Sequence, residues 1–135
     1  MTDAARDLIQ RYYAAFNARD MDAFLGMLTE DVAHDINQGG RETGKAAFAA
    51  FMTRMNRSYR EEIVDLAVFT EPTGKRAAAE FTVLGTYLAT DAGLPEARGQ
   101  TYRLPAGAFF EIRDGKVARV TNYYNLQDWL AQVRG

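Results

Sequence analysis

Few residue types in this chain are suited to chemistry. The sequence contains no cysteine and a single histidine, His34. Without cysteine there is no thiolate nucleophile, and one histidine cannot build a zinc or iron centre of several imidazoles. A Ser-His-Asp triad would have to use His34, and no Gly-x-Ser-x-Gly turn is present to supply its serine. Any chemistry must therefore depend on carboxylates, tyrosines, amides and basic side chains.

Asp35 is the first candidate for a catalytic residue. It lies in a short predicted strand with apolar neighbours. Desolvation raises the pKa of a carboxylate in an apolar cavity, which makes it a better general base. A simpler role is also open, since an aspartate at a strand end often caps the following loop, here residues 38–40. His34 precedes Asp35, so strand alternation sends the two side chains to opposite faces. If Asp35 faces a cavity, His34 faces away from it.

Tyr12 and Asn122 are two further candidates. Tyr12 lies on the apolar face of a predicted helix. It is either a core tyrosine whose hydroxyl finds a partner at the edge, or a hydrogen-bond donor in a cavity. Asn122 lies on the apolar face of a predicted strand, where an unpaired amide is costly. It either bonds the backbone or Tyr124 and orders the end of the sheet, or donates to a ligand.

Helical periodicity dominates the first part of the chain. Apolar residues recur at helical spacing over residues 5–16 and again over 21–28, with Asp20 as a suitable N-cap. A third helix is predicted to begin near residues 43–44. Its apolar stripe consists of Phe48, Phe51, Met52 and Met55. A short closing helix is predicted over residues 126–133.

The remainder of the sequence is typical of strands. A short strand is predicted at 32–37, and longer ones at 62–70, 76–90, 102–112 and 117–125. Turn residues separate them, among others at 71–74 and 113–116. The pattern predicts one α+β domain over residues 1–135, with three N-terminal helices and a bent, mostly antiparallel sheet.

The last hairpin determines which residue lies opposite Asn122. A three-residue loop at 113–115, with Gly115 at positive φ, would place residues 112 and 116 opposite each other. The cross-strand pairs would then be Ala106–Asn122, Leu104–Tyr124 and Ala108–Val120.

These elements and several local motifs resemble the nuclear-transport-factor-2-like superfamily. Residues 9–12 (Ile-Gln-Arg-Tyr) and the stretch AAFNARDMD at 14–22 are similar to the opening helices of ketosteroid isomerases. The hairpin FEIRDGKV at 110–117 resembles that of SnoaL-like polyketide cyclases. The resemblance spans nearly the whole chain. It implies a cystatin-like, cone-shaped α+β barrel whose bent sheet wraps the helices around a deep apolar pocket.

The resemblance also implies roles for single residues. The tyrosine that donates to the substrate carbonyl in these isomerases matches Tyr12, and the carboxylate that shuttles the proton matches Asp35. One residue is missing between the second helix and the strand that contains Asp35. Ketosteroid isomerase also has a carboxylic acid held neutral by its apolar site. That position corresponds to Gly107 or Ala108 here. Either the chemistry does not build a steroid-type dienolate, or another group donates, and Asn122 is the nearest candidate by hairpin register.

The same resemblance makes a set of mostly apolar side chains candidate walls of the pocket, although an ordinary core would use them equally well. The predicted substrate-binding residues are Phe16, Phe51, Met55, Phe81, Tyr102, Ala108, Phe110 and Tyr124. Chemistry of this kind needs no cofactor, and no metal site is predicted.

Composition excludes several other functions. Sixteen lysines and arginines against eighteen acidic residues give a net charge of −2, and no basic cluster stands out. Binding to nucleic acid or to an anionic membrane is therefore not expected. No uncharged run approaches the ~20 residues needed to cross a bilayer. The acidic start of the chain is unlike a signal peptide, so a cytoplasmic location is expected.

Three functions are consistent with these features. The first is a cofactor-free isomerase, cyclase or dehydratase that transfers protons in a small hydrophobic carbonyl compound, with Asp35 as shuttle and Tyr12 and Asn122 at the enolate. The second is a module that binds a small apolar molecule without catalysis. The third is a structural or assembly domain. A homodimer is expected in any case, because helices cover only one face of a sheet that is apolar on both.

Overall fold

The computed structural model describes residues 2–36 and 38–134. The first half of the chain forms α1 (Thr2–Ala18), α2 (Met21–Gly26), β1 (Leu28–Asp35), β2 (Arg41–Thr43) and α3 (Lys45–Ser58). The second half forms β3 (Tyr59–Thr70), β4 (Arg76–Tyr87), β5 (Thr101–Arg113), β6 (Lys116–Tyr124) and α4 (Leu126–Arg134). The order of elements follows the sequence prediction, with the three-residue strand β2 as an addition.

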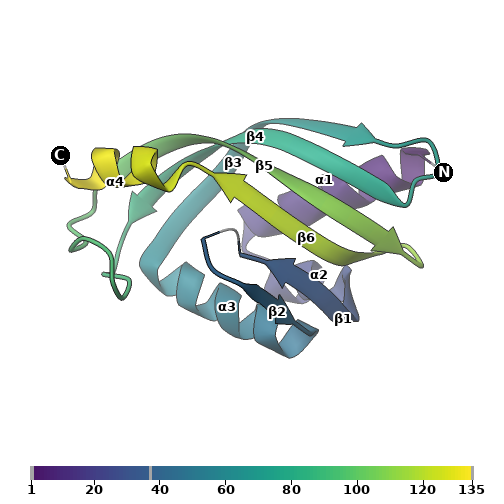
Figure 1. The fold of residues 1–135 in the computed structure, drawn as a ribbon, viewed down its shortest axis with the longest axis horizontal. Helices are drawn as coiled ribbons and strands as arrows, with labels where there is room; N and C mark the ends of the chain where they lie inside the picture. Colours follow the sequence, from purple (N-terminus) through teal and green to yellow (C-terminus); the bar gives the residue numbers. More distant parts are fainter. Residues whose placement is uncertain (1, 37, 135) are drawn as a thin grey trace.

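The strands form one curved sheet in the order β2-β1-β6-β5-β4-β3. β1 runs parallel to β6, and the other neighbouring strands are antiparallel. Helix α1 crosses behind β4 and β5, and α4 lies past the end of β6 (Figure 1). This mixed architecture, with helices against a curved and unclosed sheet, confirms the predicted cone-shaped α+β fold.

The apolar face of α1 fixes the helix to its neighbours. Tyr12 is 5% exposed, and its ring centroid lies 4.6 Å from that of Phe24 in α2 and 5.4 Å from that of Phe110 in β5. At its C-terminal end, the amide of Asn17 bonds both the N–H and the C=O of Ile63 in β3, at 2.8 and 3.0 Å. These contacts hold α1 against α2 and against strands β5 and β3.

β1 begins earlier than predicted. The predicted start was residue 32, whereas the strand begins at Leu28, which pairs with Val117 of β6. That pairing joins segments far apart in sequence, so no local pattern reports it. Asn37, the last residue predicted for this strand, lies outside the described residues.

The final hairpin is tighter than predicted. Asp114 and Gly115 both have positive φ, 54° and 73°, as in a two-residue type I′ turn, and Arg113 pairs with Lys116. An irregularity after Glu111 then shifts the register once more, so that Asn122 lies opposite Ala108. The predicted three-residue loop and its register are wrong. Because the total shift is two residues, Asn122 keeps its predicted face.

Within the described part of the chain, no helix is both long and apolar enough to cross a membrane.

Candidate functional site

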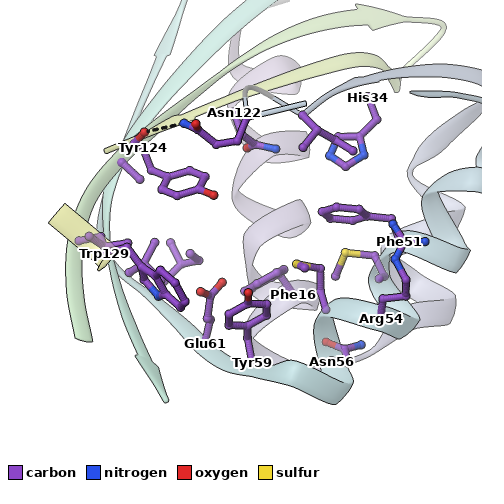
Figure 2. A pocket seen from close by; sticks show the side chains of 18 of the residues that line it. Phe16, His34, Phe51, Arg54, Asn56, Tyr59, Glu61, Asn122, Tyr124 and Trp129 are labelled. Carbon is purple, nitrogen blue, oxygen red and sulfur yellow. Dashed lines mark hydrogen bonds between the residues drawn. The ribbon is translucent and has the colours of Figure 1, made fainter. Parts of the chain in front are cut away.

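A cavity of about 540 Å³ lies between α1, α3 and the inner face of the sheet. Its size is in the range of small-molecule sites in proteins. Figure 2 shows that its walls come from β1, β3, β6 and the helices, with Trp129 of α4 at one end. Seven of the predicted site residues line it: Tyr12, Phe16, Phe51, Met55, Phe81, Asn122 and Tyr124.

Four predicted site residues do not line the cavity. Ala108 and Phe110 are 1% and 0% exposed and belong to the core, where the Phe110 ring packs on Tyr12 of α1. Tyr102 is also buried and is not among the lining residues. Asp35 lies on the other face of β1.

Asp35 is part of an ion pair on the outer face of the sheet. The Arg41 guanidinium donates two hydrogen bonds to its carboxylate, at 2.6 and 3.1 Å, and the Thr121 hydroxyl donates a third. These bonds, those from Arg41 above all, outweigh desolvation and hold the pKa of Asp35 at about 2. A carboxylate that is so easily ionised is a weak base. Asp35 is also absent from the lining of the cavity, so the prediction that it faces the cavity is wrong.

His34 occupies the cavity face instead. The opposite orientation of His34 and Asp35 is confirmed, but the two faces are exchanged relative to the prediction. The pairing of β1 with β6 is irregular just before His34, with a register shift between Leu28 and Ala33. A shift of one residue turns every side chain of a strand to the other face.

The imidazole of His34 is held between aromatic rings. It stacks on Phe48 with a centroid distance of 4.2 Å and meets the edge of Phe51 at 4.6 Å. The residue is 2% exposed, and its Nδ1 atom has no hydrogen-bond partner among the residues described. Burial lowers the pKa of His34 below its ordinary value of 6.5, so the ring is neutral near pH 7.

Glu61 is the carboxylate that the structure places in the cavity. It lies on β3 between Tyr59 and Ile63, and the alternation of the strand turns all three toward the interior. Figure 2 shows the Glu61 carboxylate directed into the cavity beside Tyr59. Burial raises the pKa of Glu61 above its ordinary value of 4.5, and a hydrogen bond from Tyr102 offsets part of that rise. Glu61 is thus a stronger base than a surface carboxylate.

The partner of Glu61 reaches it across three strands. Glu61 on β3 pairs with Gly85 on β4, and Gly85 pairs with Tyr102 on β5. Because Gly85 has no side chain, the Tyr102 ring lies directly over it, and a Cβ there would be 2.2 Å from the ring. The Tyr102 hydroxyl then donates to Glu61 Oε2. Tyr102 was predicted as a pocket wall, but its contact is with Glu61.

Two more tyrosines face the same end of the cavity. The Tyr59 hydroxyl donates to Asp91 Oδ2 at 2.8 Å. Asp91 lies in the loop after β4, and its N–H donates at 2.9 Å to the hydroxyl of Tyr87. Tyr124 directs its hydroxyl into the cavity (Figure 2). Burial, together with the charges of Glu61 and Asp91, raises the pKa of Tyr124, so it stays protonated and able to donate.

Tyr12 and Asn122 are two further polar residues of the cavity. Burial raises the pKa of Tyr12, which therefore remains a neutral phenol. The Asn122 side chain projects from β6 toward the cavity (Figure 2). Among residues 2–36 and 38–134 its amide makes no hydrogen bond, so neither a bond to the backbone nor one to Tyr124 is observed there. Asn122 is therefore a candidate donor to a ligand.

The sequence analysis missed Glu61, although a signal was present. Tyr59 and Ile63 are large residues placed two before and two after Glu61. In a strand these three share one face, so an acid between two apolar inward residues indicates a buried carboxylate. The predicted strand began at residue 62, which left Tyr59 and Glu61 outside it. His34 was missed because its face was assigned from Asp35.

A curved sheet that holds helices and an internal cavity on its inner side defines the nuclear-transport-factor-2-like class of α+β proteins. Residues 9–120 match the SnoaL-like domain model, and the chain belongs to this family. No curated protein matches the chain.

Solved structures of similar proteins agree with this assignment. A protein of Pseudomonas putida KT2440, named a candidate polyketide cyclase, is 67% identical, with a TM-score of 0.95 over 96% of this chain and 97% of that one. A protein of the same name from Xanthomonas campestris is 60% identical, with a TM-score of 0.94 over 97% of each chain. A third, from Silicibacter sp. TM1040, is 57% identical, with a TM-score of 0.94 over 96% of this chain and 95% of that one.

Proposed function

We propose that this protein is a cofactor-free enzyme that transfers a proton in a small, mostly apolar carbonyl compound, in a reaction of the cyclase or isomerase type. The observation that supports this proposal is Glu61, a carboxylate inside an apolar cavity whose pKa burial raises. The names of the similar Pseudomonas and Xanthomonas proteins support the same class of reaction.

In this proposal Glu61 is the general base. Its carboxylate takes a proton from the carbon next to the substrate carbonyl, and the electrons of that C–H bond form the enolate. The Tyr124 hydroxyl and the Asn122 amide, which face the same cavity, donate hydrogen bonds to the enolate oxygen. Losing one such donor typically costs about 10²–10³ in rate.

The fate of the enolate distinguishes the two reaction types. In an isomerase, Glu61 returns its proton to a different carbon and the carbonyl re-forms. In a cyclase, the enolate carbon attacks a second carbonyl of the same molecule, a C–C bond forms, and the proton on Glu61 passes to the new alkoxide. Both sequences need the same base and the same donors, and neither consumes a co-reactant.

The test is the exchange of α-hydrogens of 2-tetralone, a flat bicyclic ketone, in D₂O followed by ¹H NMR. Glu61→Gln keeps the shape of the side chain and removes the base, so the exchange rate should fall about 10²–10⁴-fold. Glu62→Gln is the matched control, because Glu62 is the exposed neighbour on the opposite face of β3. Fluorescence titration with 2-naphthol reports whether the cavity remains intact.

Two outcomes would overturn the proposal. One is equal exchange rates for wild type and Glu61→Gln. The other is tight binding of 2-naphthol by a wild-type protein that gives no exchange above the buffer rate, which would indicate a binding module without catalysis.

A further inference from the structure

His34 lines the end of the cavity away from Glu61, and its cross-strand neighbour is also polar. His34 on β1 and Glu42 on β2 are directly opposite each other in the antiparallel register, so their side chains share one face. In such a pair the Cβ atoms are about 4.5–5.5 Å apart. Figure 2 shows the His34 imidazole on the side of the cavity away from Glu61 and Trp129.

Each member of this pair has a buried polar atom without a partner. His34 Nδ1 and Glu42 Oε1 are both enclosed, and neither makes a hydrogen bond within residues 2–36 and 38–134. An enclosed polar atom without a partner is destabilising, so nearby complementary groups tend to pair. Asp35 on the opposite face is occupied by Arg41, which leaves Glu42 as the acid beside the imidazole.

A carboxylate beside Nδ1 determines the tautomer of the ring. An ionised carboxylate can only accept hydrogen bonds, so a bond between Glu42 and Nδ1 requires the hydrogen to be on Nδ1. The neutral ring then has no hydrogen on Nε2. Nδ1 is enclosed, so Nε2 is the nitrogen that remains for a ligand, and stacking on Phe48 and Phe51 fixes its direction.

We propose that Glu42 and His34 form a binding pair in which Nε2 of His34 accepts a hydrogen bond from a hydroxyl group of the substrate. The substrate then has two oxygen functions separated by an apolar body: a carbonyl at the Glu61 end and a phenolic or enolic hydroxyl at the His34 end. Glu42 is a positioning residue in this pair. The inference deepens the proposed function and rests on it for the placement of the carbonyl.

The first experiment uses the single histidine of the chain as a probe. In ¹⁵N-histidine-labelled protein, one imidazole gives all ring signals, and we expect a protonated Nδ1 and an unprotonated Nε2. Addition of 6-hydroxy-2-tetralone should shift the Nε2 resonance as it accepts a hydrogen bond, whereas 6-methoxy-2-tetralone should not. In Glu42→Gln the preference for the Nδ1–H tautomer should weaken. Glu80→Gln, an exposed glutamate on β4, is the control that leaves the tautomer unchanged.

The second experiment measures binding of the same two ketones to variants. A hydrogen bond of about 1 kcal/mol corresponds to roughly a fivefold difference in Kd. Wild type should therefore prefer the hydroxy ketone over the methoxy ketone by about that factor, and His34→Phe, which keeps an aromatic ring on Phe48, should lose the preference. A protonated Nε2 in the free protein, or an equal response to both ketones, would overturn the inference.

Failure of the two proposals can be told apart. If Glu61→Gln abolishes exchange but neither ketone affects the His34 signals differently, the Glu42–His34 pair is not a hydroxyl site and the proton-transfer function stands. If wild type gives no exchange while the Nε2 shift is seen, the hydroxyl site stands without that function.

Discussion

The chemistry of Glu61 follows from its position in the cavity, where burial raises its pKa. Asp35 is the useful comparison, since it lies in the same sheet and is also hydrogen-bonded. A guanidinium accompanies Asp35 and lowers its pKa, whereas Glu61 has a neutral phenol as partner and burial raises its pKa. The pKa values of the two carboxylates are therefore shifted in opposite directions, and Glu61 is the stronger base.

Removal of the Tyr102 hydroxyl should move the pH dependence of the reaction. The hydrogen bond from Tyr102 lowers the pKa of Glu61, so Tyr102→Phe should raise that pKa further. The exchange rate of 2-tetralone rises with pH as the base ionises, and its midpoint should lie at a higher pH in the variant. A pH–rate profile measures this. An unchanged or lower midpoint would contradict the role given to the hydroxyl.

Glu61→Gln should be more stable than wild type at neutral pH. The folded protein has a raised pKa for Glu61, so the charged form is disfavoured there and stability is lost as pH rises from the unfolded pKa through the folded one. The variant does not ionise and avoids that loss. Urea midpoints should therefore be higher for Glu61→Gln near pH 8 and converge with wild type near pH 4, while Glu62→Gln follows wild type throughout.

Asp35→Asn should affect stability and leave exchange unchanged. The pKa of Asp35 is about 2 in the folded protein and 3.8 ordinarily. The carboxylate therefore stabilises the fold above pH 3.8, and this contribution is lost as the pH falls through about 2. Arg41 is half exposed, so the expected loss near pH 7 is only about 1 kcal/mol. Urea unfolding of wild type and variant near pH 7 and near pH 2 measures this loss of stability. A large drop in the exchange rate of 2-tetralone would place Asp35 in the reaction after all.

At the scale of elements, the absence of a side chain at Gly85 in β4 allows the contact between Tyr102 and Glu61. Gly85 lies between Glu61 and Tyr102, and only a residue without Cβ lets the Tyr102 ring lie over the strand. Glycine is needed at position 85 because the Tyr102 ring approaches closely. Backbone conformation is not the reason, since the φ of Gly85 is not in the left-handed region.

Gly85→Ala should displace the Tyr102 ring, because the new Cβ would lie 2.2 Å from it. Overpacking of this kind costs about 1–3 kcal/mol. The hydroxyl would leave Glu61, so the pH midpoint of exchange should rise as in Tyr102→Phe. Gly26→Ala, at the end of α2 with no atom near the added Cβ, is the control. Wild-type stability in Gly85→Ala would show that the ring can move at no cost.

At the scale of the whole molecule, the outer face of the sheet exposes large apolar side chains. Phe109 on β5 and Tyr123 on β6 are 48% and 45% exposed, and their rings meet edge to face at 5.6 Å. Phe69 on β3 is 57% exposed. Apolar groups gathered on one face of a sheet are typical of a surface that a partner covers.

The sheet-face homodimer therefore stays a prediction, and Phe109 is the residue with which to test it. Light scattering at micromolar concentration should give twice the 15.1 kDa of one chain. Phe109→Lys places a charge in the proposed interface and should shift the mass toward that of one chain. A single-chain mass for the wild type would reject the dimer.

Much of the architecture followed from the sequence because its determinants are local. Helical and alternating patterns predicted the order of elements, and turn residues predicted the hairpins. Alternation also predicted correctly that Asn122 shares a face with its apolar neighbours and that His34 and Asp35 point in opposite directions. These are relations between residues close together in the chain.

The identity of the base was decided by the tertiary structure. A period of two tells which residues share a face, but which face points inward depends on the partner strand, and the pairing of β1 with β6 turned His34 in and Asp35 out. The contact of Glu61 with Tyr102 over Gly85 likewise requires three strands in one register. Register between distant strands is set by packing over the whole sheet, which local sequence patterns do not contain.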